Sequence, residues 1–580
     1  MGSRVTPVRR LVRLVLAIAV PIAIAVTGSN SSVTAQTATD AKLDRALRRL
    51  VDSPAVVRVI VTAMPGKRAA LKTKLKAAAL PLYAELPGVD AVVTGVTGLG
   101  LRTTAANAEV HHISVDARVR GFADELMVPP LAENTLLAGL GLPEGTATGT
   151  GVGVAVLDSG IVQHPEVPVA GFFDFVTGNG VKVKPFDPFG HGTHVAGMIM
   201  DLQSQADARY RSLAKGARLI GMRVLDSDGS GYTSNVIQAL EYSVRNKAAL
   251  GIDVINLSLG HPIFEPAKDD PLVKAVEQAV AAGIVVVVSA GNHGMNRDTL
   301  EVGYGGITSP GNAPSAITVG AINTRNTVTR TDDFVALWSS RGPSWYDGYA
   351  KPDIVAPGRR IVSFMARNSL LYQQNPTYYV NVADRTYMAL SGTSMATAVT
   401  SGVVALMIEG SRLTNPDRVA IPPNAIKAVL QYTAVPFAGV DELTQGAGAL
   451  NGGGAVAVAA TIDATRPQGL WWLTKNLQPR TRLSNGDTLA WSTRIVWGDR
   501  IVWGDYVYVN EPAWALRIVW GDRIVWGDRI VWGATSVVWD SRIVWGDRIV
   551  WGDSVISQSR DGSLLWGDLF GLSSAGIQGF

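Results

Sequence analysis

Cysteine is absent from all 580 residues of this chain. Its absence excludes a disulfide scaffold, a thiolate zinc site, an iron–sulfur centre and a cysteine nucleophile. A large excess of one charge is also missing, because 52 Lys and Arg stand against 48 Asp and Glu, a net charge of +4. Positions 1–130 hold 17 basic and 9 acidic residues, so the remainder is slightly acidic. The sequence therefore predicts no nucleic-acid-binding body.

Apolar residues are plentiful. They make up 47% of the chain, enough for a large core, which excludes wholesale disorder. At one domain per roughly 100–200 residues, the length predicts two to four domains.

The N-terminus has the pattern of a secretory signal. Four arginines among the first 13 residues precede an apolar stretch from Leu14 to Val26, and a small-residue segment ends at Ala35. The alternative is a membrane anchor, but Pro21 interrupts a stretch that is shorter than the roughly 20 residues needed to span a bilayer. We therefore expect a signal peptide over residues 1–35 and a secreted, extracellular protein.

Two regions of different character follow. Residues 40–120 indicate a small α+β unit, and residues 121–150, rich in Pro, Gly and Thr, indicate a linker and the start of the mature protein. β-Branched and alternating stretches predict the strands, and a Lys-rich stretch predicts the helix. The expected strands are Val56–Val61, Val89–Leu101 and His112–Val119, and the expected helix is Ala69–Ala79.

Residues 151–460 alternate short apolar runs with stretches of helical composition. Such runs are typical of parallel strands buried on both faces. The fold class predicted is α/β, an open, mostly parallel sheet with helices on both faces and an active site at the carboxyl ends of the strands. The expected strands are Val152–Leu157, Leu219–Leu225, Ile252–Leu259, Ile284–Val288, Ala316–Val319 and Ile354–Ala356, and the expected helices are His194–Leu202, Ser234–Lys247, Leu272–Ala282 and Met395–Glu409.

Residues 470–580 form a tail in which the hexapeptide Arg-Ile-Val-Trp-Gly-Asp recurs. An even period keeps each residue type on one face of an extended chain, so the repeat predicts short strands, either in hairpins or in solenoid rungs. Three roles remain open for this tail. It could be an extension without specific function, a module that contacts a cell surface or carbohydrate, or a removable propeptide.

Three segments place reactive side chains at the ends of apolar runs or the starts of helices. Asp158 follows a run, His191 stands between glycines, and Ser394 opens a stretch of small residues. A hydroxyl is a weak nucleophile at neutral pH, so it needs an imidazole to take its proton and a carboxylate to orient that imidazole. His194 leaves a zinc pair open, but the His-Glu-x-x-His pattern of zinc peptidases is absent.

Together the segments 158–160, 190–197 and 391–396 resemble the subtilisin-like serine proteases, in the order Asp, His, Ser. The resemblance covers roughly residues 145–460. It implies that Ser394 is the nucleophile, His191 the general base and then acid, and Asp158 the orienting carboxylate. Residues 286–292 resemble the strand that ends in the oxyanion-hole Asn, which implies that Asn292 stabilises the oxyanion together with the backbone N–H of Ser394.

The same resemblance implies a cleft that binds an extended peptide by strand addition. It also implies a preference for apolar or aromatic residues before the scissile bond. Trypsin-like selectivity for a basic residue there is not expected, because residues 258–261 and 289–292 contain no Asp or Glu. The expected substrate-binding residues are Ser258, Leu259, Gly260, Gly229 and Gly231, with Ala290 and Gly291 as the facing wall of the main pocket.

Two departures from the family pattern stand near the site. Ala398 replaces a common Pro, which in a first helical turn mainly presets φ, and His261 replaces a common Gly at the cleft. The chemistry requires no cofactor. The family often binds structural calcium, but no ligand set is identified, and turn formation is the alternative role for the candidate carboxylates. These candidates are Asp226, Asp228, Asp332 and Asp333.

Residues 40–120 resemble the inhibitory prodomain of the family in position, size and texture. This implies that its last strand lies in the cleft and is cut by Ser394 between His112 and Pro130. The expected function is a secreted serine endopeptidase, made as a self-processed zymogen, that acts on proteins or peptides. The alternative is an inactive protease scaffold that presents the Trp-rich tail for binding or surface attachment.

Overall fold

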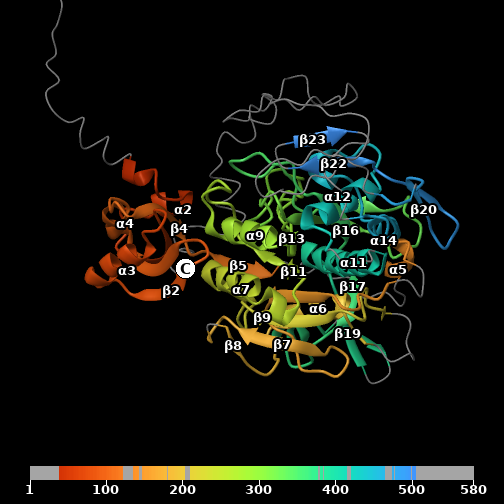
Figure 1. Cartoon of the computed structure of the whole chain (residues 1–580), viewed down its shortest axis with the longest axis horizontal. Coiled ribbons are helices and arrows are strands. Elements are labelled where there is room, and N and C mark those ends of the chain that lie inside the picture. Colours follow the sequence, from red (N-terminus) through yellow and green to blue (C-terminus); the bar gives the residue numbers. More distant parts are fainter. Residues whose placement is uncertain are drawn as a thin grey trace, which may run out of the picture.

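In the computed structural model of this chain, the described residues are 38–121, 135–142, 147–178, 180–202, 210–376, 379–382, 385–414, 420–463, 473–475, 477–497 and 500–503. The signal predicted over residues 1–35 and the repeats after residue 503 lie outside them. Figure 1 shows a small N-terminal unit at one end of a larger body.

The N-terminal unit is an antiparallel sheet of order β2-β3-β1-β4 with two helices packed on it. Apolar side chains of α3 (Arg68–Ala77) and α4 (Gly98–Ala105) meet those of the strands in a core separate from the rest of the chain. Its strands are β1 (Val56–Ala63), β2 (Leu82–Leu86), β3 (Ala91–Thr97) and β4 (Val110–Val115), and the short helix α2 (Arg45–Arg48) precedes them.

Two strand predictions in this region are wrong in part. The strand expected over 89–101 ends at Thr97, because the Thr97 side chain accepts a hydrogen bond from the Gly100 N–H and caps α4. The strand expected over 112–119 is two strands, β4 and β5 (Arg118–Gly121). Asp116 separates them, because its carboxylate accepts the backbone N–H and the hydroxyl of Ser234 in the body, both at 2.8 Å.

The body is built on a nine-stranded sheet. Its path is β15-β14-β13-β11-β6-β9-β7-β8, and β16 pairs with β14. Only the edge strands β8 and β15 pair antiparallel, so the mostly parallel open sheet predicted from the apolar runs is confirmed. The strands are β6 (Gly153–Asp158), β7 (Val169–Asp174), β8 (Val181–Lys182), β9 (Arg218–Arg223), β11 (Val254–Leu257), β13 (Val285–Ser289), β14 (Ile317–Asn323), β15 (Phe334–Val335) and β16 (Ile354–Pro357).

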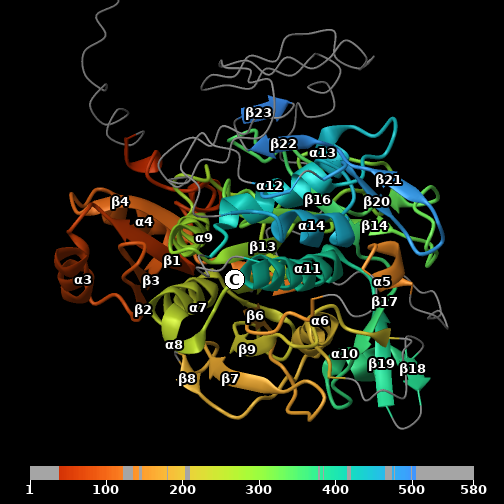
Figure 2. The ribbon, with the colours of Figure 1, turned by 45° about the vertical axis from the view of Figure 1, so that its right-hand side comes forward.

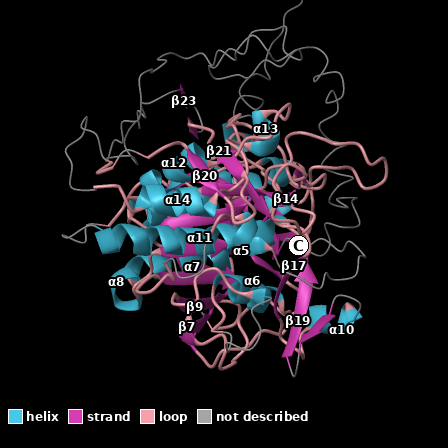
Figure 3. Cartoon of the chain, turned by 90° about the vertical axis from the view of Figure 1, so that its right-hand side faces the viewer, coloured by secondary structure: helices cyan, strands magenta, loops and turns pink. Residues whose placement is uncertain are grey.

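Helices lie on both faces of this sheet, as Figures 2 and 3 show. Alternate residues of β6 point to opposite faces. Val154 and Val156 join the core formed with one set of helices, and Ala155 and Leu157 join the core formed with the other. The first set is α6 (His191–Ile199), α11 (Thr393–Thr414), α12 (Pro423–Thr433) and α14 (Gly452–Ala459), and the second is α7 (Thr233–Arg245) and α9 (Pro271–Ala281).

The helix α11 runs through the middle of the body. By its length of 22 residues and its mean hydropathy this helix could cross a membrane, and it is the one such helix in the described part of the chain. The apolar window of α11 is completely buried inside the protein, which identifies it as a core helix. Because α11 is rigidly packed, the position of Ser394 in its first turn is fixed.

The C-terminal described residues include the Arg-Ile-Val-Trp part of the first two hexapeptide repeats. There β22 (Arg494–Trp497) pairs antiparallel with β23 (Arg500–Trp503). The remaining short elements are α5 (Leu136–Gly139), β10 (Ser230–Tyr232), α8 (Lys247–Leu250), β12 (Leu259–Gly260), β17 (Ile361–Phe364), α10 (Leu370–Gln374), β18 (Tyr379–Val382), β19 (Arg385–Leu390), α13 (Glu442–Gln445), β20 (Arg480–Arg482) and β21 (Thr488–Ala490).

Candidate active site

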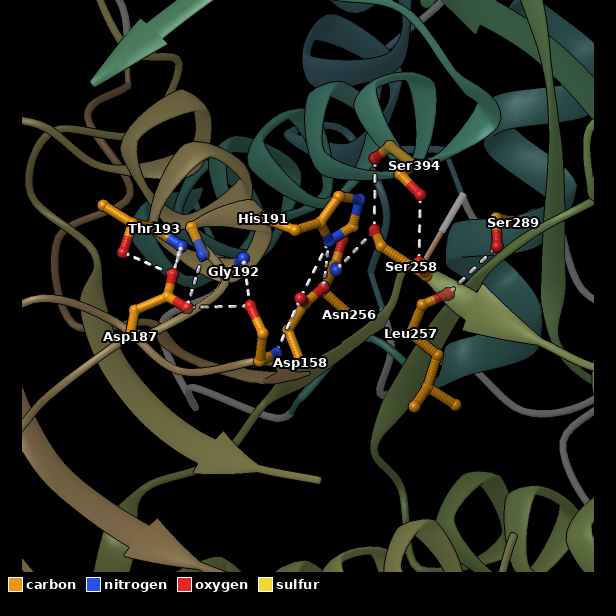
Figure 4. Close-up of polar contacts among 12 residues, drawn as sticks. Asp158, Asp187, His191, Gly192, Thr193, Asn256, Leu257, Ser258, Ser289 and Ser394 are labelled. Carbon is orange, nitrogen blue, oxygen red and sulfur yellow. Dashed lines mark hydrogen bonds and ion pairs between the residues drawn. The ribbon is translucent and has the colours of Figure 1, made fainter. Parts of the chain in front are cut away.

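Three side chains singled out from the sequence come from three different elements. Asp158 is the last residue of β6, His191 the first residue of α6, and Ser394 the second residue of α11. β6 is a central parallel strand, and its carboxyl end is where an open α/β sheet carries its site. Figure 4 shows the His191 ring between Asp158 and Ser394.

The Asp158 carboxylate holds the His191 ring in one orientation. Nδ1 of His191 lies 2.8 and 2.9 Å from the two carboxylate oxygens, and both side chains are buried. A carboxylate only accepts, so Nδ1 carries the proton and Nε2 is left as the basic nitrogen. The backbone N–H of Ser159 donates to Asp158 at 2.7 Å and fixes the carboxylate in turn.

Charge and burial act in opposite directions on His191. Burial lowers the pKa of the imidazole, but the neighbouring Asp158 carboxylate and, at longer range, Asp187 raise it, and the net pKa lies above its usual value. The imidazolium that forms when His191 takes a proton is therefore stabilised in place.

The Ser394 hydroxyl is held beside the imidazole by a network in β11 and α11. It donates to the backbone carbonyl of Ser258 at 2.9 Å, and the Ser258 hydroxyl donates to the backbone carbonyl of Ser394 at 3.1 Å. Asn256 supports Ser258 from below, with its amide nitrogen 2.9 Å from the Ser258 hydroxyl. Nε2 of His191 is buried and has no hydrogen-bond partner among the described residues. A rotation of the hydroxyl toward His191 would fill that position.

Asp187 is a functional residue that the sequence analysis missed. Its carboxylate accepts the backbone N–H groups of Gly190 and Thr193, both at 2.8 Å, and the hydroxyls of Thr193 and Ser159 at 2.6 and 2.9 Å. Gly190, the residue that caps α6, has no side chain to do this. Asp187 therefore satisfies the first turn of the helix that carries His191.

Asn292 is oriented by Thr393, which the sequence analysis also missed. The amide oxygen of Asn292 accepts the backbone N–H of Thr393 at 3.0 Å and its hydroxyl at 2.9 Å. A backbone N–H can only donate, so the atom facing it must be the oxygen, and the amide nitrogen faces the other way. The amide N–H₂ of Asn292 is thus directed away from Thr393, next to the N-terminus of α11.

The chain's own strand β5 lies in the expected substrate cleft. It pairs antiparallel with β10 on one side and with β12 on the other. Arg120 pairs with Ser230 and Gly260, Gly121 with Leu259, and Val119 with Gly231. The N–H of Gly121 donates to the Gly229 carbonyl at 3.3 Å. The residues expected to bind a peptide backbone therefore surround a peptide strand.

Gly121 ends this strand against the catalytic imidazole. A Cβ added to Gly121 would lie 3.1 Å from Nδ1 and Cε1 of His191, tighter than ordinary contact. Ala290 and Gly291, the expected pocket wall, lie at the end of β13 rather than in the strands that pair with β5. The Gly291 N–H donates to the Thr393 hydroxyl at 3.2 Å, which joins this wall to the Asn292–Thr393 contact.

The other ionisable candidates have structural partners. Nε2–H of His194 donates to the carbonyls of Met388 and Ile361, and burial lowers the pKa of His194 to about 3, so it is neutral. Asp333 pairs with Arg330 at 2.6 Å, and Asp332 accepts the Thr327 hydroxyl. Within the described ranges, no group of three or more His, Asp or Glu could hold a metal ion.

Comparison with known proteins places these features in one family. The profile of the subtilase family matches residues 149–458. The chain is 39% identical over 313 residues to serine protease AprX of Bacillus subtilis (strain 168), a match that covers 53% of this chain and 66% of that protein. It is 36% identical over 263 residues to subtilisin of Bacillus pumilus, a match that covers 45% of this chain and 78% of that protein.

Other matches cover a smaller part of the related proteins. Subtilisin E of Bacillus subtilis (strain 168) is 37% identical over 263 residues, which span 45% of this chain and 56% of that protein. Among solved structures, fervidolysin from Fervidobacterium pennivorans, a keratinolytic enzyme related to subtilisin, superposes with a TM-score of 0.54 at 21% identity. That superposition covers 70% of this chain and 61% of the other, and it supports the fold.

Proposed function

The chain belongs to the subtilase family of serine proteases, and from this premise we propose that it is a secreted endopeptidase made as a self-processed zymogen. The observation that carries the proposal is the strand β5, which occupies the peptide-binding cleft and ends at Gly121 beside His191. A peptide strand in that place has the geometry of a substrate. Apolar or aromatic residues before the scissile bond and protein or peptide substrates are part of the proposal.

The proposed mechanism uses side chains of this chain alone. Oγ of Ser394 attacks the peptide carbonyl carbon while Nε2 of His191 takes the hydroxyl proton, and Asp158 stabilises the imidazolium. The oxyanion accepts hydrogen bonds from the Asn292 amide and the Ser394 N–H. His191 then gives the proton to the leaving amine, and water, activated by the same imidazole, hydrolyses the acyl-enzyme.

The strand register supports a choice of the bond that is cut. In the pairing of β5 with β12, Arg120 is opposite Gly260 and Gly121 is opposite Leu259. Phe122 follows Gly121 in the sequence, and Ser258, whose carbonyl accepts the Ser394 hydroxyl, precedes Leu259. We therefore propose that Ser394 attacks the carbonyl of Phe122 and that the bond between Phe122 and Ala123 is broken.

Production of the wild-type chain and its Ser394→Ala variant side by side, followed by mass measurement of the exported proteins, tests this proposal. Wild type should lose everything before Ala123, and the variant should keep residues 36–122 attached. Ser411→Ala is a matched control, because this buried hydroxyl of α11 has no hydrogen-bond partner among the described residues. It should be processed like wild type.

Two outcomes would contradict parts of the proposal. If the Ser394→Ala chain is also cut at Ala123, another protease performs the step. If the wild-type chain is exported intact and cleaves no peptide, the inactive scaffold with a binding tail becomes the better account. We also propose that the Trp-rich tail contacts a cell surface or carbohydrate, and the sequence of its repeats is the support for this contact.

A further inference from the structure

The first residue of β5, Arg118, reaches a group of polar side chains on the body. Its guanidinium nitrogen Nη2 lies 3.3 Å from an oxygen of Asp226 and 3.9 Å from one of Asp228. The same nitrogen donates to the Ser230 hydroxyl. The guanidinium also lies over the Tyr232 ring, 4.8 Å from its centroid. One basic side chain is therefore bound by two carboxylates, a hydroxyl and an aromatic face.

All four partners belong to the body and not to the N-terminal unit. They lie within residues 226–232, the turn and strand β10 that form one edge of the cleft. When β5 leaves after cleavage, these groups stay on the enzyme. A substrate peptide that binds in the position of β5 would place its residue equivalent to Arg118 against these four groups.

The two carboxylates are held in position by the turn itself. Asp226 accepts the backbone N–H groups of Asp228 and Ser230, at 3.2 and 3.3 Å. Asp228 accepts the N–H of Ser230 at 2.8 Å. The hydrogen bond with Asp226, the bonds from Ser230 and the nearby Arg118 lower the pKa of Asp228 to about 2, so this carboxylate is charged at neutral pH. Burial and the same hydrogen bond raise the pKa of Asp226.

The next residues of the strand differ from Arg118. Val119 is completely buried among apolar side chains of the body, whereas Arg120 is exposed. Gly121 faces the His191 ring without room for a Cβ. Only one of the two arginines in this strand is thus bound through its side chain, which provides an internal comparison.

We propose that Asp226, Asp228, Ser230 and Tyr232 form a subsite that selects a basic residue of peptide substrates, four positions before the residue whose carbonyl is attacked. Arg is preferred over Lys, because a guanidinium can bond both a carboxylate and a hydroxyl while it stacks on the tyrosine ring. The inference rests on the proposed function and adds a substrate class to it.

The first test uses the processed enzyme and peptides with the sequence of residues 117–124. Position 118 is Arg, Lys, Leu or Glu in four versions, and a fifth peptide keeps Arg at 118 but carries Leu at 120. We expect kcat/KM for the unchanged peptide to exceed that for the Arg118→Leu peptide about threefold to tenfold, since the ion pairs are partly exposed. Replacing Arg120 by Leu should change kcat/KM by less than twofold.

The enzyme variant D226N/D228N provides the second half of this test. Asn keeps an oxygen that can accept the backbone N–H groups of the turn, so the loop is preserved while both carboxyl groups are removed. This variant should cleave the unchanged peptide no faster than the Arg118→Leu peptide. Equal rates for these two peptides with the wild-type enzyme would overturn the subsite and leave the endopeptidase proposal standing.

A readout without catalysis separates the two proposals. In the full Ser394→Ala chain, amide hydrogen exchange of residues 118–121 reports how firmly β5 is bound. Arg118→Leu and D226N/D228N should each speed this exchange severalfold, and Arg120→Leu should not. If no peptide is cleaved, the endopeptidase proposal fails, and this exchange pattern alone decides the subsite. Identical exchange in the Arg118→Leu and Arg120→Leu chains would refute it.

Discussion

At the scale of single residues, the site depends on which atom faces which. Nδ1–H of His191 donates to the carboxylate oxygens of Asp158, so only Nε2 can receive the serine proton. The oxygen of Asn292 accepts from Thr393, so its nitrogen faces the other way, which is the orientation that the proposed oxyanion role requires. In each case a buried partner removes one of two orientations, and the remaining one suits the reaction.

Removal of the Asp158 charge should weaken both the orientation and the basicity of His191. We expect Asp158→Asn to lower kcat about 10⁴-fold, because the wrong imidazole tautomer is favoured. Wild-type activity requires neutral His191, so kcat/KM should rise with pH through the raised pKa of this imidazole. In the variant that rise should move to lower pH. A pH profile of kcat/KM for both proteins checks this, and an unmoved acid limb would contradict the assigned base.

The oxyanion donor should act on the chemical step rather than on binding. Asn292→Ala is expected to lower kcat about 10²–10³-fold with little change in KM. Thr393→Val removes only the hydroxyl that orients the Asn292 amide, and about a tenfold loss is expected, with recovery in Thr393→Ser. Steady-state kinetics on one peptide measures all three. A loss confined to KM would show that Asn292 acts in ground-state binding.

At the scale of elements, both catalytic helices begin at the site, and their first turns are satisfied by side chains from other segments. Asp187 accepts four hydrogen bonds around the start of α6. Asn292 performs a related task for α11 through the backbone N–H of Thr393. The same contacts that complete the helices therefore set the distance between the reacting groups.

Loss of the Asp187 carboxylate should destabilise α6 and displace His191. Asp187→Ala removes all four acceptor contacts, and we expect the free energy of unfolding to fall by about 2–4 kcal/mol. Asp187→Asn should lose less, because one oxygen remains. Denaturant unfolding in the Ser394→Ala background, where self-digestion is absent, measures both. A wild-type midpoint in Asp187→Ala would show that water replaces the carboxylate.

The strands of the body could be predicted from the sequence because each is a short apolar run, as β13 with Val285–Ser289 illustrates. The end of β3 could not be predicted, because Thr97 is both the last residue of the strand and the residue whose side chain caps α4. Asp158, His191 and Ser394 stand in recognisable segments. The contacts of Thr393 with Asn292, and of the Asp226–Asp228 turn with Arg118, could not be predicted, since they join segments distant in the sequence. Asp187 lies outside the recognisable segments.

At the scale of the whole molecule, the N-terminal unit and the body share buried polar contacts. The backbone N–H of Arg45 donates to the carbonyl of Phe264 at 3.0 Å, and His112 contacts Glu265. Gly88 N–H donates to Glu241 of α7 at 2.7 Å, and Asp116 bonds Ser234 at the start of the same helix. The N-terminal unit is therefore bound to the body through α7 and the segment 264–265 as well as through β5.

Acidic groups at this junction should make it sensitive to pH. Burial, followed by the charge of Glu265, raises the pKa of Asp44 from 3.8 to about 7, and burial raises that of Glu265 well above its usual value. Groups with raised pKa stabilise the folded junction below pH 4, and this contribution is lost as pH rises toward and through 7. Burial lowers the pKa of His112, which opposes the trend at acidic pH.

We therefore expect the cleaved N-terminal unit to leave the body faster at pH 8 than at pH 5.5. Asp44→Asn should reduce this difference, because it removes one of the two titrating carboxyls and keeps an acceptor for the Val115 N–H. The time course of peptide cleavage after processing, followed at both pH values, checks the prediction. Faster release at pH 5.5 would mean that protonation of His112 dominates.

Occupation of the cleft by β5 also makes activation depend on dilution. While the chain is intact, the strand and its cleft belong to one molecule, and the local concentration of such a tethered ligand is on the order of millimolar. After the cut, the N-terminal unit is a separate molecule, and its hold on the cleft falls as the two partners spread apart. The proposed protease would therefore stay inhibited where its concentration is high and become active on dilution.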